Sequence, residues 1–263
     1  MEVSPKVELR FSNLEMLFAE KPFDEALADI KSANGQLATA QQVAQARIVG
    51  GKEHHVSQYG SWTAENFIYF PNGKILATYA DYSPILKHAS EATEAHRNGN
   101  EFYISKEEVK NLEEMAKEDS RKKPSEQRVY TFDKTKSYEI PISKFAKDKL
   151  ARFMFKEDAN KYAEFLQKAG ITKVPVWLVD RSNIKQQKAP FARPLWFRGL
   201  GGRSDLGGNY RDLGYLIRAR GVRVASEAST HPYVNLIEKY GIKSEKELKS
   251  ALELYEQAKK IVA

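Results

Sequence analysis

Apolar residues recur at helical spacing in several parts of the chain. The segment Phe23–Asn34 predicts a helix, because its apolar side chains share one face and Gly35 follows as a stop signal. Thr39 and Gln42 have the spacing of a capping box, in which each residue bonds the main chain of the other. A second helix is therefore predicted from Thr39 onward.

Three further helices are predicted in the middle and at the end of the chain. Ser105 and Glu108 again have capping-box spacing, and apolar positions at helical intervals predict a helix to about Ala116. The polar run "EDSRKKPSEQR" that follows predicts a loop, and "DANKYAEFLQKAG" predicts another helix. A final helix is predicted from Ser244, with an apolar stripe along one face.

Strand signals lie between these helices. "FIYFPNGKILATY" predicts a hairpin, since two apolar runs flank Asn72-Gly73, a pair that accepts positive φ in a tight turn. "VPVWLV" predicts a short buried strand. Strands do not alternate regularly with helices, so the pattern favours an α+β fold over a parallel sheet.

Length and composition are those of a globular protein. The 263 residues are 41% hydrophobic, enough for one large domain or two small ones with a real core. No apolar run approaches the roughly 18 residues of a membrane span, and the N-terminus lacks the apolar centre of a signal peptide. We therefore expect a soluble protein, whose display on a virion or cell surface would require assembly into a larger particle.

Charge and cysteine usage remove several classes of function. The net charge is +7, but acidic and basic residues are interleaved and aromatic residues do not alternate with the basic runs, so nucleic-acid binding is not predicted. The chain contains no cysteine, which excludes disulfides, thiolate metal sites and cysteine nucleophiles.

No catalytic or metal-binding motif is present. "GLGGRSDLGG" contains neither a phosphate-binding loop with its lysine nor a complete dinucleotide fingerprint, and "GRSDL" breaks the pattern of a serine nucleophile turn. The histidines are not spaced as metal ligands on a helix. No catalytic residue, cofactor or metal is predicted from them (His54, His55, His88, His96 and His231).

The segment Trp196–Ser226 departs from the rest of the chain in composition. It holds seven of the 15 glycines and six of the 14 arginines, but no lysine, glutamate, glutamine or methionine. By overall composition about eight residues of those four types would be expected there.

Two interleaved sets of residues make up this segment. The apolar set is predicted to anchor the segment to the core: Trp196, Phe197, Leu200, Leu206, Leu213, Ile217, Val222 and Val224. The small or polar set is predicted to face water and to bind a ligand. It comprises Arg198, Gly199, Gly201, Gly202, Asp205, Gly207, Asn209, Tyr210, Asp212, Gly214 and Tyr215.

The genetic code accounts for the missing residue types. Asparagine codons are AAC and AAT, and replacing either adenine while keeping the final pyrimidine yields Gly, Asp, Tyr, Arg, Ser and Leu among others. Such replacement never yields Lys, Glu, Gln, Met or Trp. The residue types absent from the polar set are thus those that a pyrimidine-ending codon cannot encode.

The chain resembles a variable protein of a diversity-generating retroelement, of archaeal or archaeal-virus type. The resemblance is carried by "PLWFRGL", by the scatter of Gly, Asp, Tyr and Arg, and by the closing "RARGVR". The resemblance is specific over Pro194–Ser226 and weaker over Phe23–Tyr79, and it does not extend to residues 100–190. It implies a C-type lectin fold whose variable region is rewritten by adenine-directed mutagenic retrotransposition.

The resemblance also implies a domain organisation. We expect a C-type lectin-like domain over residues 1–230, with a helical insertion near 100–170 and the variable region at about 194–226. Residues 231–263 would form a helical extension, a departure from the family pattern in which the variable region ends the chain. Formylglycine-generating enzymes share this fold but need catalytic cysteines, and the Glu-Pro-Asn type triplet of calcium-binding lectins does not occur here.

The expected function is binding with exchangeable specificity, to a protein or glycan ligand such as a host surface receptor. Tyr210 and Tyr215 are the best candidates for contact, because tyrosine offers a large area with few rotatable bonds. Arg198 and Arg203 can pair with carboxylates or stack on rings. Two alternatives stay open. One is an enzyme whose site lies in the middle of the chain, near Arg128, Tyr130, Asp180 and Arg181, and the other is a structural virion protein.

Overall fold

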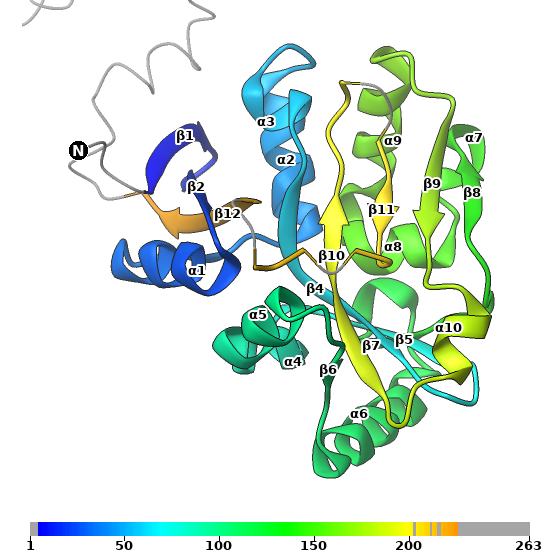
Figure 1. Ribbon diagram of the computed structural model, residues 1–263. Helices are drawn as coiled ribbons and strands as arrows, with labels where there is room; N and C mark the ends of the chain where they lie inside the picture. Colours follow the sequence, from blue (N-terminus) through cyan, green and yellow to red (C-terminus); the bar gives the residue numbers. More distant parts are fainter. Residues whose placement is uncertain (1–4, 202–203, 211, 215–216, 226–263) are drawn as a thin grey trace, which may run out of the picture. The chain divides into compact units, whose positions relative to one another are not determined.

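The computed structural model describes residues 5–201, 204–210, 212–214 and 217–225 (Figure 1). The chain divides into two compact units, Met1–Arg223 and Val224–Ala263. The second unit lies almost entirely outside the described residues, and with it the predicted extension over 231–263 and the predicted helix from Ser244. The described helices and strands belong to the first unit, except for Val224 at the end of the last strand.

Ten α-helices are present among the described residues. They are α1 (Phe23–Ser32), α2 (Ala40–Gly50), α3 (His55–Gln58), α4 (Pro84–Lys87), α5 (Ala89–Arg97), α6 (Lys106–Asp119), α7 (Ile142–Phe145), α8 (Lys149–Phe155), α9 (Ala159–Lys168) and α10 (Arg181–Lys185). There are also three short 3-10 helices, η1 (Ala80–Tyr82), η2 (Pro124–Glu126) and η3 (Lys156–Asp158), of which η3 connects α8 to α9.

The strands of the described part form one sheet. They are β1 (Lys6–Phe11), β2 (Leu14–Lys21), β3 (Gln36–Leu37), β4 (Ser61–Tyr69), β5 (Ile75–Thr78), β6 (Phe102–Tyr103), β7 (Val129–Thr131), β8 (Tyr138–Pro141), β9 (Lys173–Trp177), β10 (Phe191–Phe197), β11 (Leu206–Gly207) and β12 (Ile217–Val224). The main order is β1-β2-β12-β4-β10-β11-β9-β8, while β3, β5, β6 and β7 pair alongside this path.

Among the strand pairs whose register the described residues give, most are antiparallel and two are parallel. The long central strands β4 and β10 run antiparallel, with Trp62 opposite Trp196 (Figure 1). The parallel pairs join β12 to β4 and β11 to β9. A mainly antiparallel sheet with helices confirms the α+β prediction, although the sequence did not indicate the two parallel pairs.

The sheet separates two buried clusters. Phe67 and Tyr69 of β4 belong to the cluster that also contains α2, α8 and α9, whereas Trp62 and Ile68 belong to the cluster with α1, α5 and α6. Because side chains alternate between the faces of a strand, β4 serves both clusters, and all nine of its residues are buried. Helices therefore cover both faces of the central strands.

Local signals predicted several of these elements correctly. The capping boxes at Thr39 and Ser105 are both formed, and they begin α2 and α6. The hairpin turn has Gly73 at φ +90°, and the Phe70 N–H donates to the Lys74 carbonyl at 3.0 Å. The helix after Ser105 continues to Asp119, three residues beyond the predicted end, so the predicted loop begins later and includes η2.

The segment predicted as a helical insertion supplies more than helices. It contains α6–α9, but it also contributes β7, which pairs with β5, and β8, which pairs with β9.

A buried glutamate links the sheet to α2. Glu65 of β4 faces α2, and its carboxylate accepts the Ala40 N–H at 3.0 and 3.1 Å. Burial raises the pKa of Glu65 to about 7, although hydrogen bonds and Lys156 oppose the shift.

Candidate functional site

An open cavity of about 900 Å³ lies beside the ends of β10 and α3. One side is formed by the end of α3 and the start of β4, and the other by the end of β10 and the loops after it. Ten described residues line the cavity: Gln58, Tyr59, Gly60, Trp62, Trp196, Arg198, Gly199, Gly201, Tyr210 and Asp212.

Three aromatic rings give this cavity an apolar surface. The Trp62 and Trp196 rings meet edge to face with centroids 5.0 Å apart, and the Trp196 and Tyr210 centroids are 6.5 Å apart. Trp62 is 1% exposed, whereas Trp196 and Tyr210 are half-buried. Trp62 thus lies at the base of the cavity, and the other two rings are partly accessible, so a flat apolar group of a ligand could contact them.

Arg198 is held between two residues of the loops. Its Nε lies 3.0 Å from Asp205 Oδ2, and its Nη2 donates to the Tyr210 hydroxyl at 2.6 Å. Burial alone would lower the pKa of Arg198, but the Asp205 charge and the Tyr210 hydrogen bond outweigh burial and raise it. Its side chain remains 39% exposed, so the guanidinium is both oriented and accessible.

Buried arginines position the opposite side of the cavity. Arg220 of β12 is fully buried and donates through Nη1 to the carbonyls of Tyr59 and Gly60 at 3.1 and 3.3 Å. Arg47 of α2, also fully buried, donates to the Tyr59 and Phe197 carbonyls at 3.5 and 3.4 Å. Both guanidinium groups therefore converge on the main chain of the segment that lines the cavity.

Glu8 of β1 neutralises one of these arginines. Arg220 donates to its two carboxylate oxygens at 2.7 and 3.0 Å, and His55 Nδ1 also contacts the carboxylate. Burial alone would raise the pKa of Glu8, but Arg220 and His55 lower it. The first strand of the chain thereby takes part in positioning the cavity, a contribution that sequence reasoning missed.

Main-chain hydrogen bonds attach the loops after β10 to their surroundings. The Leu200 N–H donates to the Ser57 carbonyl at 2.6 Å, and the Arg198 N–H donates to the Asp205 carbonyl at 3.0 Å. The Gly208 N–H donates to the Trp177 carbonyl at 2.9 Å. These bonds hold the loops against α3, against one another and against β9.

Two glycines of the predicted binding set differ sharply in the space around them. A Cβ at Gly199 would lie 2.3 Å from the Gln58 carbonyl oxygen, a main-chain atom that cannot swing aside. A Cβ at Gly201 would lie 3.3 Å from the same oxygen, a tight contact that a shift of a few tenths of an ångström would relieve. Gly199 is therefore required by packing, whereas Gly201 can take a side chain after such a small shift.

The predicted binding residues only partly gather at the cavity. Arg198, Gly199, Gly201, Tyr210 and Asp212 line it, and Asn209 is exposed outside the lining. Gly214 is half-buried, with Arg97 packed 2.8 Å from the position of a Cβ. Gly202 and Tyr215 lie outside the described residues.

The prediction that Asp205 and Gly207 face water was wrong. The Asp205 carboxylate is fully buried, because it accepts the Trp177 indole N–H at 3.2 Å and pairs with Arg198. Gly207 is buried in β11, and the Tyr210 ring packs 2.6 Å from the position its Cβ would take. Both residues support the cavity from behind and do not face it. Gly199 is buried as well, although it lines the cavity.

The predicted apolar anchors are mostly correct. Phe197, Leu200, Leu206, Leu213 and Val222 are buried. Trp196 packs against the core as predicted, but its ring is only half-buried and also lines the cavity. The prediction for Val224 was wrong, because it is 69% exposed. The side chain of Ile217 lies outside the described residues.

Half of the lining comes from residues that sequence reasoning did not assign to the site: Gln58, Tyr59, Gly60, Trp62 and Trp196. All but one precede the variable region by more than 130 residues. Glycine is required at position 60 for the two segments to meet, since a Cβ there would lie 2.6 Å from the Trp196 ring, and no local signal in the sequence indicates this.

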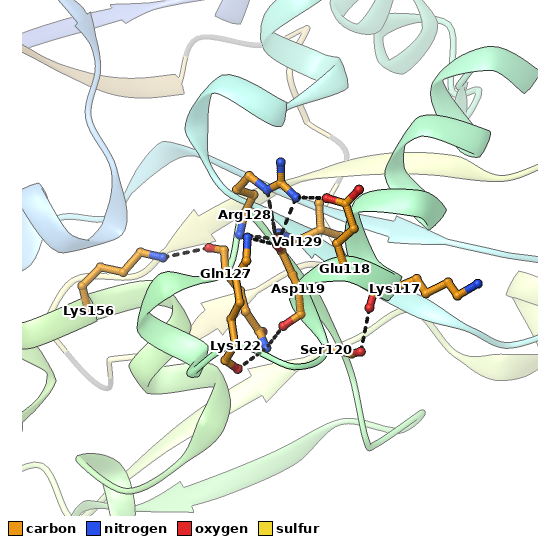
Figure 2. Close-up of polar contacts among 9 residues, drawn as sticks. All are labelled: Lys117, Glu118, Asp119, Ser120, Lys122, Gln127, Arg128, Val129 and Lys156. Carbon is orange, nitrogen blue, oxygen red and sulfur yellow. Dashed lines mark hydrogen bonds and ion pairs between the residues drawn. The ribbon is translucent and has the colours of Figure 1, made fainter.

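Two residues named for the alternative site in the middle of the chain, Arg128 and Tyr130, take part in structural contacts. Arg128 donates to Asp119 and Glu118, as Figure 2 shows, and the Asp119 carboxylate also accepts the main-chain N–H groups of Arg128 and Val129. Tyr130 is buried against Phe132 and Phe153, while Arg181 begins α10 beside Gly73. Arg128 and Tyr130 thus join α6, β7 and α8.

Asp119 is the centre of that structural cluster. It is fully buried, and Lys122 Nζ donates to it at 2.7 Å. Burial alone would raise the pKa of Asp119, but the hydrogen bonds from Arg128, Lys122 and the main chain lower it to about 2. The carboxylate is therefore ionised and occupied by these partners, as a structural ion pair requires.

The described residues offer neither a metal-binding cluster nor a membrane-spanning helix. No group of three or more His, Asp or Glu side chains in this part of the chain is placed to hold a metal ion. No helix within the described ranges is long and apolar enough to cross a membrane.

Comparison with known proteins bears on the fold. A scan against protein families finds no match to this chain, and no curated protein matches it. Among solved structures, the chain is similar to a protein of Nanoarchaeota described as showing the accommodation of massive sequence variation by the C-type lectin fold. The two share 17% identity at a TM-score of 0.56, over 85% of this chain and 100% of that one. The chain thus has the C-type lectin fold that the sequence predicted.

Proposed function

We propose that this protein binds ligands through a hypervariable surface that adenine-directed mutagenic retrotransposition diversifies. The observation that carries the proposal is the composition of the cavity's second side. Arg198, Gly201, Tyr210 and Asp212 all come from the segment whose residue types fit rewritten asparagine codons, and all four line the same open cavity. Clefts of this size that combine aromatic surface with a few polar groups are typical of ligand sites.

The surrounding structure supports exchange of these side chains. The residues that hold the loops in place are buried, including Asp205, Phe197, Leu206 and Leu213. The candidate positions on the cavity are exposed or half-buried, and surface substitutions away from caps and cores usually change stability by about 0.5 kcal/mol or less. The buried framework can therefore stay the same while the side chains around the cavity vary.

The similar solved structure is consistent with this proposal. It is described as showing the accommodation of massive sequence variation by the C-type lectin fold. Partners are proposed accordingly: a protein or glycan ligand such as a host surface receptor, with the protein displayed on a virion or cell by assembly.

Sequencing sibling copies of the gene tests the proposal. We expect a nearby repeat of the 194–226 coding region, beside a reverse transcriptase gene, that differs from it only at adenines. Among sibling copies, amino-acid differences should concentrate at Arg198, Gly201, Asn209, Tyr210 and Asp212. Differences spread evenly over all four nucleotides, or equally frequent in residues 100–190, would contradict it.

A further inference from the structure

Three arginines of β12 join this strand to the N-terminal hairpin that β1 and β2 form. They belong to "RARGVR", which closes the variable segment. Each is paired with a different glutamate of the hairpin: Arg218 with Glu20 at 3.5 Å, Arg220 with Glu8 at 2.7 Å, and Arg223 with Glu15 at 2.8 Å. The end of the variable segment is thus tied to the first two strands of the chain.

Two of these pairs hold buried charges. The side chains of Arg220 and Glu8 are 0% and 6% exposed, and that of Glu15 is 1% exposed. Arg223 Nη1 also donates to the Ala33 carbonyl, directly after α1, at 3.2 Å. Removing one partner of a buried ion pair is strongly destabilising, because the other charge stays in the interior. Exchange of Arg220 or Arg223 for another side chain would therefore take a partner away from a buried carboxylate.

Arg218 extends this attachment to the cavity. Its guanidinium lies over the Tyr59 ring, 4.5 Å from the ring centroid, and Tyr59 lines the cavity. The centroid of the His55 ring is 4.6 Å from that of the Tyr59 ring. Tyr59 is 44% exposed, and a cation over the face of an aromatic ring is attracted to it. Arg218 therefore helps to orient an exposed ring of the candidate ligand site.

Glu20 in turn orients Arg218. Its carboxylate lies 3.5 Å from Arg218 Nε, and the side chains of Glu20 and Arg218 are 50% and 34% exposed. An exposed ion pair of this kind adds little to stability, but it restricts where the guanidinium lies. The contribution of Glu20 is therefore expected in the placement of the Tyr59 ring more than in the stability of the protein.

We propose that Arg218 and Glu20 are positioning residues of the ligand site. Glu20 orients the Arg218 guanidinium, and the guanidinium holds the Tyr59 ring at the cavity. Arg220 and Arg223 attach the strand that carries Arg218 to the N-terminal hairpin. The three arginines of β12 are therefore constant, although they lie inside the segment that is rewritten. This inference rests on the proposed function, since it assumes that the cavity is the ligand site and that the segment is diversified.

The genetic code allows these arginines to escape rewriting. Arginine codons that begin with CG carry an adenine at most in the third position, where its replacement is silent. The codons AGA and AGG, by contrast, can become glycine, serine, tryptophan or stop codons. In the nearby repeat of the coding region, we therefore expect codons that begin with CG for Arg218, Arg220 and Arg223. For Arg198, which lines the cavity, we expect AAC or AAT.

NMR of the tyrosine rings in the full chain tests the contact between Arg218 and Tyr59. The Tyr59 signal is the one that Tyr59→Phe removes, and Tyr103 of β6, whose hydroxyl donates to Gln187, provides a reference ring. Arg218→Gln should shift the Tyr59 signal and leave the Tyr103 signal in place. Glu20→Gln should shift the Tyr59 signal in the same direction by a smaller amount.

Thermal unfolding separates positioning from stability. Arg218→Gln and Glu20→Gln should unfold within about 4 °C of the parent protein, because their ion pair is exposed. Arg220→Gln should lower the unfolding temperature more, since it takes the arginine partner away from the buried Glu8. Arg181→Gln, which removes an exposed arginine beside Gly73, is the matched control and should leave the Tyr59 signal in place. If Arg220→Gln does not fold, the Arg218 variant carries the test.

Three results would overturn the proposal: an unchanged Tyr59 signal in Arg218→Gln, a codon AAC or AAT in the nearby repeat at position 218, 220 or 223, or sibling copies that vary at these positions as often as at positions 198 and 210. Failure here is distinguishable from failure of the proposed function. Adenine-directed variation that includes the arginines of β12 would leave a diversified site without these positioning residues. Absence of such variation from the whole segment would contradict the proposed function, and the Tyr59 signal would still decide the role of Arg218.

Discussion

The two sides of the cavity are built by opposite means. On the side formed by α3 and β4, the buried Arg47 and Arg220 donate hydrogen bonds to the main-chain carbonyl of Tyr59. The base of this side is the buried Trp62. The side from the loops after β10 presents exposed or half-buried residues such as Arg198, Tyr210 and Asp212. The contrast teaches that one site can keep its shape on one side while its chemistry changes on the other.

The two aspartates of the variable segment give the largest expected contrast. Asp205→Ala should lower the free energy of unfolding by about 1–3 kcal/mol, because it removes the ion pair with the partly exposed Arg198 and the hydrogen bond from the Trp177 indole N–H. Asp212→Ala, at an exposed position, should change it by about 0.5 kcal/mol or less. Urea unfolding of both variants measures the difference, and equal effects would break the comparison.

A rise in pH should lower the free energy of unfolding through the buried Glu65, which lies outside the cavity lining. The folded-state pKa of Glu65 is about 7, above the ordinary value of 4.5, so the folded protein binds this proton more tightly than the unfolded chain. The associated stability is complete below pH 4.5 and is lost as pH rises through about 7. The loss should amount to about 3 kcal/mol.

Glu65→Gln should remove this pH dependence, since the amide does not ionise. Glu113→Gln is the matched control, because Glu113 is an exposed carboxylate paired with Lys74 on the surface. Unfolding measured at pH 5 and pH 8 compares the two variants with the parent protein. A parent protein equally stable at both pH values would show that Glu65 does not titrate in this range.

Two glycines sharpen the comparison at the rim itself. Gly199→Ala should lower the free energy of unfolding by about 1–3 kcal/mol, since its Cβ would meet the Gln58 carbonyl oxygen. Gly201→Ala should change it by about 0.5 kcal/mol or less. Thermal unfolding of the two variants measures the difference, and equal stabilities would show that packing does not require glycine at position 199.

Tyr210 should give a modest effect on stability and a clear effect on binding. Tyr210→Ser is expected to lower the free energy of unfolding by about 1 kcal/mol, because its half-buried ring packs over Gly207. Unfolding should stay cooperative, while ligand binding changes. Tyr210→Phe separates the ring from the hydroxyl that Arg198 bonds. Loss of cooperativity in Tyr210→Ser would place the ring in the core.

The elements that the sequence predicted are those with local signals. The capping residues Thr39 and Ser105 and the turn at Gly73 act within a few residues, so the helices and the hairpin that they mark could be found from the chain alone. The parallel pairing of β12 with β4 depends on contacts across more than 150 residues, and no local pattern reports it.

The same limit explains the errors at the site. Composition separated the variable segment from the rest of the chain, but it could not distinguish Asp205 from Asp212, because burial of Asp205 depends on Trp177 from another strand. Trp196 was assigned to the core on its hydrophobicity, although an aromatic ring serves equally well as the wall of a cavity. The lining residues on the α3 side of the cavity could be identified only from the structure.

The attachment of the loops has a consequence for evolution. The hydrogen bonds donated by the N–H groups of Arg198, Leu200 and Gly208 involve only atoms that every residue except proline possesses. Rewriting a codon therefore leaves these attachments intact, with one exception: CCC and CCT, which encode proline, arise when both adenines of an asparagine codon become cytosine. Proline lacks the N–H that each of these bonds uses. A lineage that diversifies this segment should therefore keep these attachments whichever side chain its exposed positions carry, yet lose the copies in which proline reaches one of those three positions.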